Sequence, residues 1–232
     1  MLVETPAVVL RTQRFGETSL IATLYTALYG KCSVLAKGAR RQGSERAAAL
    51  ELFCHSRVSF YYTPRKELYL LRTAELVSFP KLVRSSVERL AAASLVAEAV
   101  LLTQEPGESN PPLFGLLLQA LQRLEEEHSR PEAVAIGFLL RLTAVLGFAL
   151  PVEEMVRGGN AQHAALPHGI VLAEEDAALL GELAAGRELP IEWRQARRLA
   201  GFFAAYLGHH LGRALTFRSV QLWEPLESAP AR

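Results

Sequence analysis

The sequence predicts an α+β protein with two domains, a small closed β-barrel over residues 1–79 and an all-helical domain over residues 80–232. The spacing of apolar residues changes near residue 80 from a strand-like to a helix-like pattern. The charge changes at the same place. Residues 1–79 carry 11 Lys and Arg against 6 Glu, whereas residues 80–232 carry 14 Lys and Arg against 18 acidic residues. The barrel is therefore expected to be the basic part of the chain.

Five segments of the first domain have the composition of strands. They are rich in Val, Leu, Tyr, Phe and Thr and are separated by short turn signals. They cover residues 7–14, 18–26, 30–38, 50–62 and 66–77. Five short strands in a basic region predict a five-stranded OB-fold barrel, whose strand faces and loops commonly bind oligonucleotides.

The second domain has helical spacing throughout, with expected helices at about residues 80–103, 111–128, 131–147, 174–185 and 192–213. Residues 133–152 are apolar enough to resemble a membrane span, but they contain Arg141. A central Arg costs about 2.5–3.5 kcal/mol on insertion scales. We therefore expect a buried core helix and no membrane association.

The two cysteines, Cys32 and Cys54, are too few for a disulfide framework and lack metal-ligand spacing. The first residues, MLVETPAVVLR, have neither the basic region nor the apolar core of a signal peptide. A cytoplasmic chain with reduced thiols is the expectation.

Four cations and two glycines crowd into the stretch AKGARRQGSER, residues 36–46, between two predicted strands. The cations are Lys37, Arg40, Arg41 and Arg46. Glycine allows the backbone to turn and to approach a ligand closely. Cationic side chains in such a loop suit DNA phosphates, and phosphate contacts carry little sequence information.

Alternation along the strands places further candidates on a polar face of the barrel. The predicted DNA-binding set is completed by Arg14, Lys31, Arg57 and Tyr61. A groove with cations and an aromatic ring suits single-stranded nucleic acid, because the backbone attracts positive charge and the bases stack. The alternative is ordinary surface charge with tyrosines that pack the barrel.

The stretch VVLRTQRFGETSLIATLYTALYGKCSVLAKGARR, residues 8–41, resembles the N-terminal pattern of the RecO family of bacterial recombination mediators. Residues 67–76 and 202–222 are similar to the same family. The resemblance implies an N-terminal OB-fold, a helical C-terminal domain and a non-enzymatic role. It also implies binding of single- and double-stranded DNA, annealing of complementary strands, and work with RecR that lets RecA displace single-strand-binding protein. A nucleoid-associated location would follow.

Many members of that family carry a four-cysteine zinc module after an LGF-x-x-P turn. This sequence has the turn at residues 146–151, but no cysteine follows it. His163 and His168 remain without the paired spacing of a tetrahedral zinc site. We expect a cysteine-free remnant of the module at about residues 150–173, with no metal and no cofactor.

Two groups of cations in the helical domain are candidates for binding a partner. The resemblance implies a site there for the acidic C-terminal tail of single-strand-binding protein, and Arg141, alone in an apolar helix, is the first candidate. The competing location is a stripe on the last long helix, made of Arg194, Arg198 and Arg213. Ordinary alternatives remain for both, namely a paired or snorkelling Arg141 and a solvated polar face.

The sequence contains no recognisable motif of a hydrolase, a metalloprotease, a phosphate loop or a dinucleotide-binding turn. A metal-dependent nuclease needs converging carboxylates, and Asp176 is the only aspartate in the chain. We therefore expect a protein that is not an enzyme. The rival interpretation is a helical adaptor that binds only protein and uses the barrel as a docking module.

Overall fold

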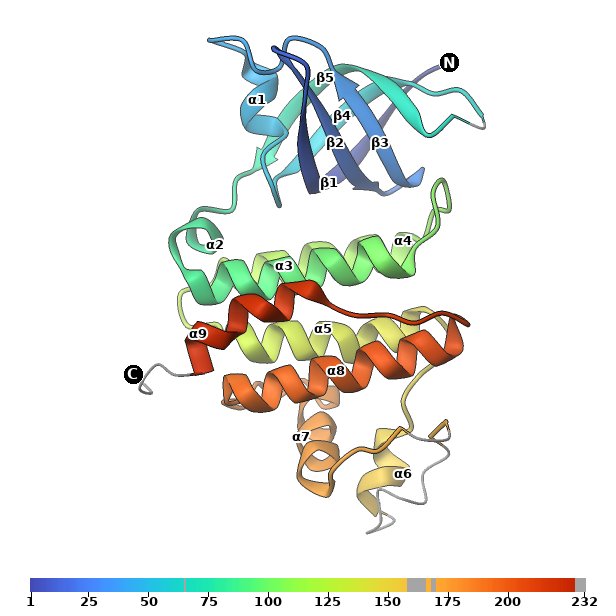
Figure 1. Ribbon diagram of the computed structural model, residues 1–232, viewed down its shortest axis with the longest axis vertical. Helices are drawn as coiled ribbons and strands as arrows, with labels where there is room; N and C mark the ends of the chain where they lie inside the picture. Colours follow the sequence, from blue (N-terminus) through green and yellow to red (C-terminus); the bar gives the residue numbers. More distant parts are fainter. Residues whose placement is uncertain (65, 158–165, 168–169, 228–232) are drawn as a thin grey trace. The chain divides into compact units, whose positions relative to one another are not determined.

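The computed structural model describes residues 1–64, 66–157, 166–167 and 170–227 (Figure 1). The chain divides into two compact units. One comprises Met1–Lys81 and Gln104–Leu121, and the other comprises Leu82–Thr103 and Gln122–Arg232. The predicted boundary near residue 80 lies where the chain first leaves the barrel unit. The return of Gln104–Leu121 to that unit was not predicted.

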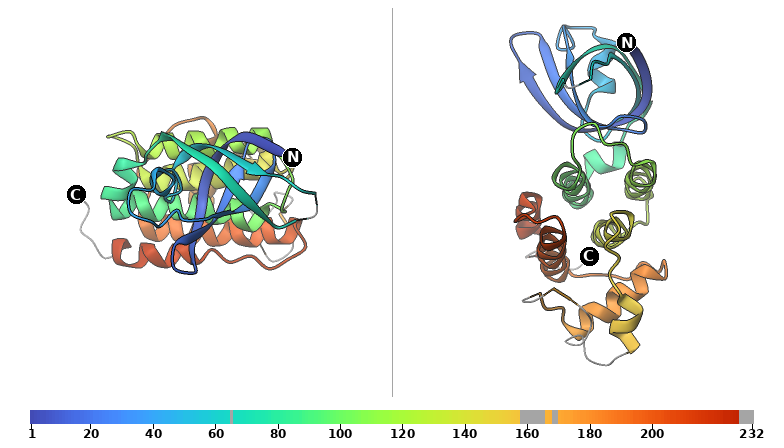
Figure 2. Two further views of the ribbon diagram at one scale, coloured as in Figure 1. Left: turned by 90° about the horizontal axis from the view of Figure 1, so that it is seen from above. Right: turned by 90° about the vertical axis from the view of Figure 1, so that its right-hand side faces the viewer.

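The first unit contains a closed barrel with strand order β1-β2-β3-β5-β4, and its strands curl into a ring in Figure 2. They are β1 (Leu2–Phe15), β2 (Ser19–Thr26), β3 (Gly30–Ala36), β4 (His55–Tyr61) and β5 (Leu68–Ser78). All neighbouring pairs are antiparallel except β3 and β5. The predicted five-stranded OB-fold barrel is confirmed.

Strand β1 is longer than the predicted segment at residues 7–14 because it pairs along two edges. Its first half pairs with β4 from Leu2 to Val8, and its second half pairs with β2. A register shift between Val9 and Arg11 interrupts the pairing with β2. Pro6 lies within β1, and its carbonyl accepts the Ala27 N–H at 3.0 Å.

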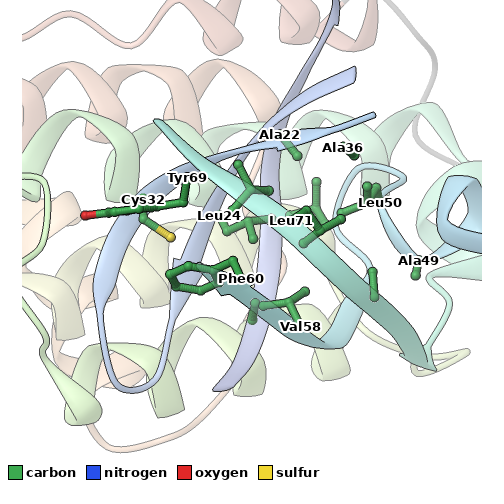
Figure 3. Close-up of a cluster of buried hydrophobic side chains, with 14 of the residues drawn as sticks. Ala22, Leu24, Cys32, Ala36, Ala49, Leu50, Val58, Phe60, Tyr69 and Leu71 are labelled. Carbon is green, nitrogen blue, oxygen red and sulfur yellow. The ribbon is translucent and has the colours of Figure 1, made fainter. Parts of the chain in front are cut away.

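Alternate residues of the strands fill the barrel core, as the strand periodicity requires. In β3 the side chains of Cys32 and Val34 are buried, whereas Lys31 and Ser33 are partly exposed. Figure 3 shows the core extending from Tyr69 and Cys32 at one end to Ala49 and Leu50 at the other. Ala49 and Leu50 come from the short helix α1 (Glu45–Ala49) and its C-cap, which the sequence analysis did not predict.

The segment that follows α3 (Val87–Thr103) is bound to the barrel by polar contacts. The Tyr25 hydroxyl lies 3.3 Å from Gln104 Oε1, the Gly107 N–H donates to the Lys31 carbonyl at 2.9 Å, and the Ser109 hydroxyl donates to the Ala27 carbonyl at 2.9 Å. These bonds explain why residues 104–121, including most of α4 (Pro111–Leu124), belong to the barrel unit.

Gly30 permits the closest approach in this region. Its φ is +57°, and a Cβ built there would lie 1.9 Å from the Glu108 carbonyl oxygen. We predict that Gly30→Ala destabilises the protein by more than the ~1–2 kcal/mol that left-handed backbone costs an L-residue. Gly16→Ala is the matched control, because Gly16 has a φ of +59° and nothing within 4 Å of its Cβ position. If the two variants lose the same unfolding free energy in urea, the result contradicts the close approach of Glu108 to Gly30.

The second unit is helical (Figure 1). The remaining helices are α2 (Lys81–Ser85), α3 (Val87–Thr103), α5 (Pro131–Val145), α6 (Val152–Arg157), α7 (Glu174–Ala184), α8 (Trp193–His210), the 3₁₀ helix η1 (Arg218–Trp223) and α9 (Glu224–Glu227). Each of the longer predicted helices has a counterpart. The short elements α6, η1 and α9 were not predicted, because fewer than two turns give no clear periodicity.

Helix α5 is the centre of the helical unit and packs against α3, α7 and α8. Consecutive residues from Glu132 to Leu140 are buried, which explains why the segment is apolar on every side. In the part of the chain that the structure describes, no helix is long and apolar enough to cross a membrane. The interpretation of residues 133–152 as a membrane span is therefore not supported.

Candidate nucleic-acid interface

The cationic loop, defined here as residues 37–46, is held against the turn between β1 and β2. The Arg40 N–H donates to the Thr18 carbonyl at 2.9 Å. Its guanidinium Nη1 lies 3.0 Å from the Glu17 carbonyl oxygen and 3.3 Å from that of Gly16. All three acceptors are backbone carbonyls, so these bonds hold the loop without pairing the Arg40 guanidinium with a carboxylate.

Two glycines shape the cationic loop in the way that the sequence suggested. Gly38 has a φ of +70° and Gly43 a φ of +78°, a region that L-residues rarely adopt. The Arg41 side chain packs over Gly38, with Cδ 3.5 Å from the position of an added Cβ. A larger residue at position 38 would therefore strain the backbone and crowd the Arg41 side chain.

The cations of the loop are exposed, and no ion pair to them is found among the described side chains. Lys37, Arg40, Arg41 and Arg46 are all exposed. Among the side chains that the structure describes, none of the four forms an ion pair. Four exposed cations on a fixed loop make a surface that attracts anions.

Arg14 joins the loop from a neighbouring strand. It is exposed near the end of β1 and pairs in register with Leu20, which in turn pairs with Ala36. Because Lys37 follows Ala36 directly, Arg14 and Lys37 lie at the same end of the barrel. The structure thus brings together Arg14 and the four cations of the loop.

The other three predicted DNA-binding residues lie elsewhere on the barrel. Lys31 is at the opposite end of β3 from Lys37. Arg57 lies opposite Glu75 and is paired with Glu4 at 3.9 Å, so carboxylates offset its charge. Tyr61 is 43% exposed, and its hydroxyl accepts a hydrogen bond from Arg72 at 3.1 Å.

The β1–β2 turn, residues 16–18, is the part of this site that sequence reasoning missed. Its carbonyl groups accept hydrogen bonds from Arg40 and so position that residue. Every residue has a backbone carbonyl, so the sequence does not show which carbonyl accepts such a bond. The available signal was the sequence Phe-Gly-Glu-Thr at residues 15–18, in which Gly16 allows a tight turn.

Arg141 lines a pocket of the helical unit with a volume of about 500 Å³. The guanidinium is exposed and donates to the carbonyls of Gly137 at 3.3 Å and Leu183 at 3.4 Å. Apolar side chains of α5 and of the segment leading into α6 form much of the lining, which also includes the acidic residues Glu153 and Glu154. The pocket thus combines one cation, an apolar surface and two carboxylates.

The predicted stripe is divided among different contacts, and Arg213 lies beyond the end of α8 rather than on it as expected. Arg198 binds the buried Asp176 through Nε and Nη2, both at 2.8 Å, and also pairs with Glu175 at 2.7 Å. These hydrogen bonds, chiefly the one to Asp176, raise the pKa of Arg198. Arg213 donates to the Leu102 carbonyl. Arg194 is exposed on the first turn of α8.

Arg198 has a structural role because it binds the buried carboxylate of Asp176. The carboxylate is 2% exposed and is also bound by Gln195 at 2.9 Å. Loss of one partner of a buried pair leaves an uncompensated charge. Since the Arg198 side chain is half-exposed, we predict that Arg198→Ala costs about 1–3 kcal/mol of unfolding free energy.

The control for that prediction is Arg194→Ala on the same helix, which should cost less than about 0.5 kcal/mol, as surface changes usually do. Urea unfolding followed by circular dichroism measures both. A loss for Arg198→Ala no larger than that of the control would contradict the structural role of the Asp176–Arg198 pair.

The predicted zinc-module remnant falls mainly on residues that are not described. His163 and His168 lie outside the described residues. Across residues 1–64, 66–157, 166–167 and 170–227, no group of three or more His, Cys, Asp or Glu side chains is placed to hold a metal ion. The expectation that no metal is bound stays a prediction.

The fold and the loop together define a class of protein, a small OB-fold barrel with a cationic loop joined to a helical region. The family model described as "Recombination protein O N terminal" matches residues 1–80, and the one described as "Recombination protein O C terminal" matches residues 84–218. The chain belongs to the RecO family of DNA repair proteins, as its resemblance to that family predicted.

Relatives named DNA repair protein RecO support this assignment. The protein of Salinibacter ruber is 34% identical over 66% of this chain and 58% of its own length, and that of Desulfatibacillum aliphaticivorans is 35% identical over 66% and 60%. In those two alignments the chain covers less than two thirds of the relative. The protein of Nocardioides sp. is 32% identical over 93% of this chain and 97% of its own length.

Proposed function

We propose that this chain is a non-enzymatic recombination mediator that binds single- and double-stranded DNA and anneals complementary strands. With RecR, it would help load RecA onto DNA coated by single-strand-binding protein, in the cytoplasm at the nucleoid. The observation that carries the proposal is the cationic loop fixed by Arg40. Membership of a family of DNA repair proteins supports it.

The geometry of the loop favours contacts with phosphate over contacts with bases. Its exposed side chains include Lys37, Arg40, Arg41 and Arg46, and the loop itself contains no aromatic residue on which a base would stack. Phosphate contacts depend on charge and carry little sequence information. Such binding suits annealing, because a mediator must accept any pair of complementary strands and release the duplex.

The double variant Lys37→Ala/Arg41→Ala tests the loop. Each phosphate contact contributes about 0.7 to the slope of log affinity against log salt for single strands. We predict that the slope falls by about 1.4 and that affinity falls for all sequences alike. Fluorescence anisotropy of a labelled oligonucleotide at several salt concentrations measures both quantities.

The matched control is Arg57→Ala, which removes an exposed arginine of the same barrel that is already paired with Glu4. It should leave the slope nearly unchanged. If the two variants change the slope equally, the loop is not the site of phosphate binding.

We further propose that the Arg141 pocket receives the acidic tail of single-strand-binding protein. The guanidinium offers a charged donor to a carboxylate, and the apolar lining of the pocket offers an anchor for an apolar side chain. Glu153 and Glu154 oppose a strongly acidic peptide. The peptide is therefore expected to bind through its apolar end and one carboxylate, with its other acidic groups turned toward solvent.

Arg141→Ala should weaken the binding of a labelled tail peptide by about tenfold or more, since a hydrogen bond to a charged group contributes about 1.5–3 kcal/mol. The affinity for DNA should stay unchanged. Glu153→Gln should strengthen peptide binding, because it removes a like charge from the pocket lining. Arg194→Ala is the control, and a loss of peptide binding in that variant but not in Arg141→Ala would place the site on α8 instead.

A protein-only adaptor remains the second candidate, and one feature of the barrel favours it. Leu2 pairs in register with Tyr61, and Tyr61 pairs with Leu70, so three exposed apolar side chains form a row across β1, β4 and β5. They are 48%, 43% and 39% exposed. Exposed apolar patches often bind protein partners. Titration of labelled single-stranded DNA at two salt concentrations separates the two candidates, because an adaptor would show no salt-dependent binding.

A further inference from the structure

The barrel unit contains a second candidate site at the opposite end of β3 from the cationic loop. A cleft of about 440 Å³ lies between the start of β3, the side chains of Tyr62, Lys66, Glu67 and Tyr69, and residues 106–108. That volume falls within the range of small-molecule sites. The cleft and the loop are separated by the length of β3, about 20 Å at ~3.3 Å per residue.

One wall of the cleft is held rigidly by backbone contacts. The Gly107 N–H donates to the Lys31 carbonyl at 2.9 Å, and residues 31 and 106 form a parallel bridge. Gly30 allows Glu108 to lie against the barrel without a clash. This wall exists because residues 104–110 are bound to the strands, so the cleft is built by two distant parts of the chain.

Aromatic rings line the inner side of the cleft. Tyr62 and Tyr69 have ring centroids 5.3 Å apart, and they contact Tyr29 and Phe60 at 5.0 Å and 5.2 Å respectively. Cys32 also lines the cleft, and burial raises the pKa of its thiol to about 12. The thiol is therefore uncharged at neutral pH, and the inner surface is aromatic and neutral.

Charged side chains of both signs complete the lining. Lys31 and Lys66 supply ammonium groups, and Glu67 and Glu108 supply carboxylates. A ligand that matches this set has an anionic group, N–H donors and a flat apolar body. A nucleotide has all three, because its phosphate suits ammonium groups, its amino group suits a carboxylate, and its base packs on aromatic rings.

We propose that this cleft binds one nucleotide unit whose base carries an exocyclic amino group, such as cytosine or adenine. The cationic loop holds the phosphate backbone through charge, whereas the cleft takes a single unstacked base. The nucleotide is either part of a DNA strand or free in solution, and only the first source rests on the proposed DNA binding. The carboxylates favour cytosine over thymine, because thymine has no amino group to donate.

The test uses the full chain and two kinds of ligand, free dCMP or dTMP and short oligomers of dC or dT. Two-dimensional NMR locates the binding. We expect dC ligands to shift the amide signals of residues 31, 66, 67 and 69, with an affinity about fivefold or more above that of dT ligands. Lys66→Ala should abolish these shifts. Because Lys66 is exposed, the circular dichroism spectrum of the variant should match that of the unchanged protein.

The two sources and the two sites give separable results. Shifts with dCMP show that the cleft accepts a free nucleotide, and shifts with the oligomer alone show that it takes a nucleotide of a strand; either supports the proposal. In Lys37→Ala/Arg41→Ala, dCMP should still bind the cleft while oligomers lose affinity. The proposal is overturned if neither ligand shifts the cleft signals in a Lys66-dependent way, even when oligomers still bind the loop. If the unchanged protein binds no oligomer at all, the proposed function is refuted instead.

Discussion

Closure of the barrel by β1 is the constraint on which the rest of the barrel unit depends. The strand pairs with β4 along its first half and with β2 along its second, and a register shift at Val9/Arg11 interrupts the pairing with β2. This double pairing carries the end of β1 to the turn at residues 16–18, where the cationic loop is anchored through Arg40. It also sets the β2–β3 end of the barrel, to which residues 104–110 bind. Both candidate sites of the barrel therefore follow from how one strand closes it.

Ion pairing separates the structural cations of this protein from the candidate DNA-binding cations, which composition alone does not. Arg57, Arg123 and Arg198 each bind a carboxylate, and so contribute to structure while their charge is offset. Among the described side chains, the cations of the loop form no ion pair, and Arg40 binds only backbone carbonyls in the bonds described above. An uncompensated charge attracts phosphate strongly, whereas a paired one must first give up its partner. The basic excess of residues 1–79 is therefore most available to an anion at the end of the barrel that carries the cationic loop.

Much of the fold could be predicted from the sequence because it rests on local periodicity. Alternation in β3 puts Lys31 at the surface and Cys32 in the core, as strand periodicity requires. Pairings between distant residues could not be predicted. Arg198 resembled a free surface cation until Asp176, from another helix, was seen to bind it. The return of residues 104–121 to the barrel and the tyrosine-lined cleft depend on contacts of the same kind, for which one sequence contains no signal.

The central claim is that DNA binds this protein at the fixed cationic loop. Hydrogen–deuterium exchange of the full chain, with and without a saturating single-stranded oligonucleotide, tests it most directly. Backbone amides of residues 14–18 and 37–46 should exchange more slowly in the complex, since bound phosphates would cover the loop and stabilise its bonds to the turn. Protection confined to the helical unit, with the loop and turn unchanged, would contradict the account.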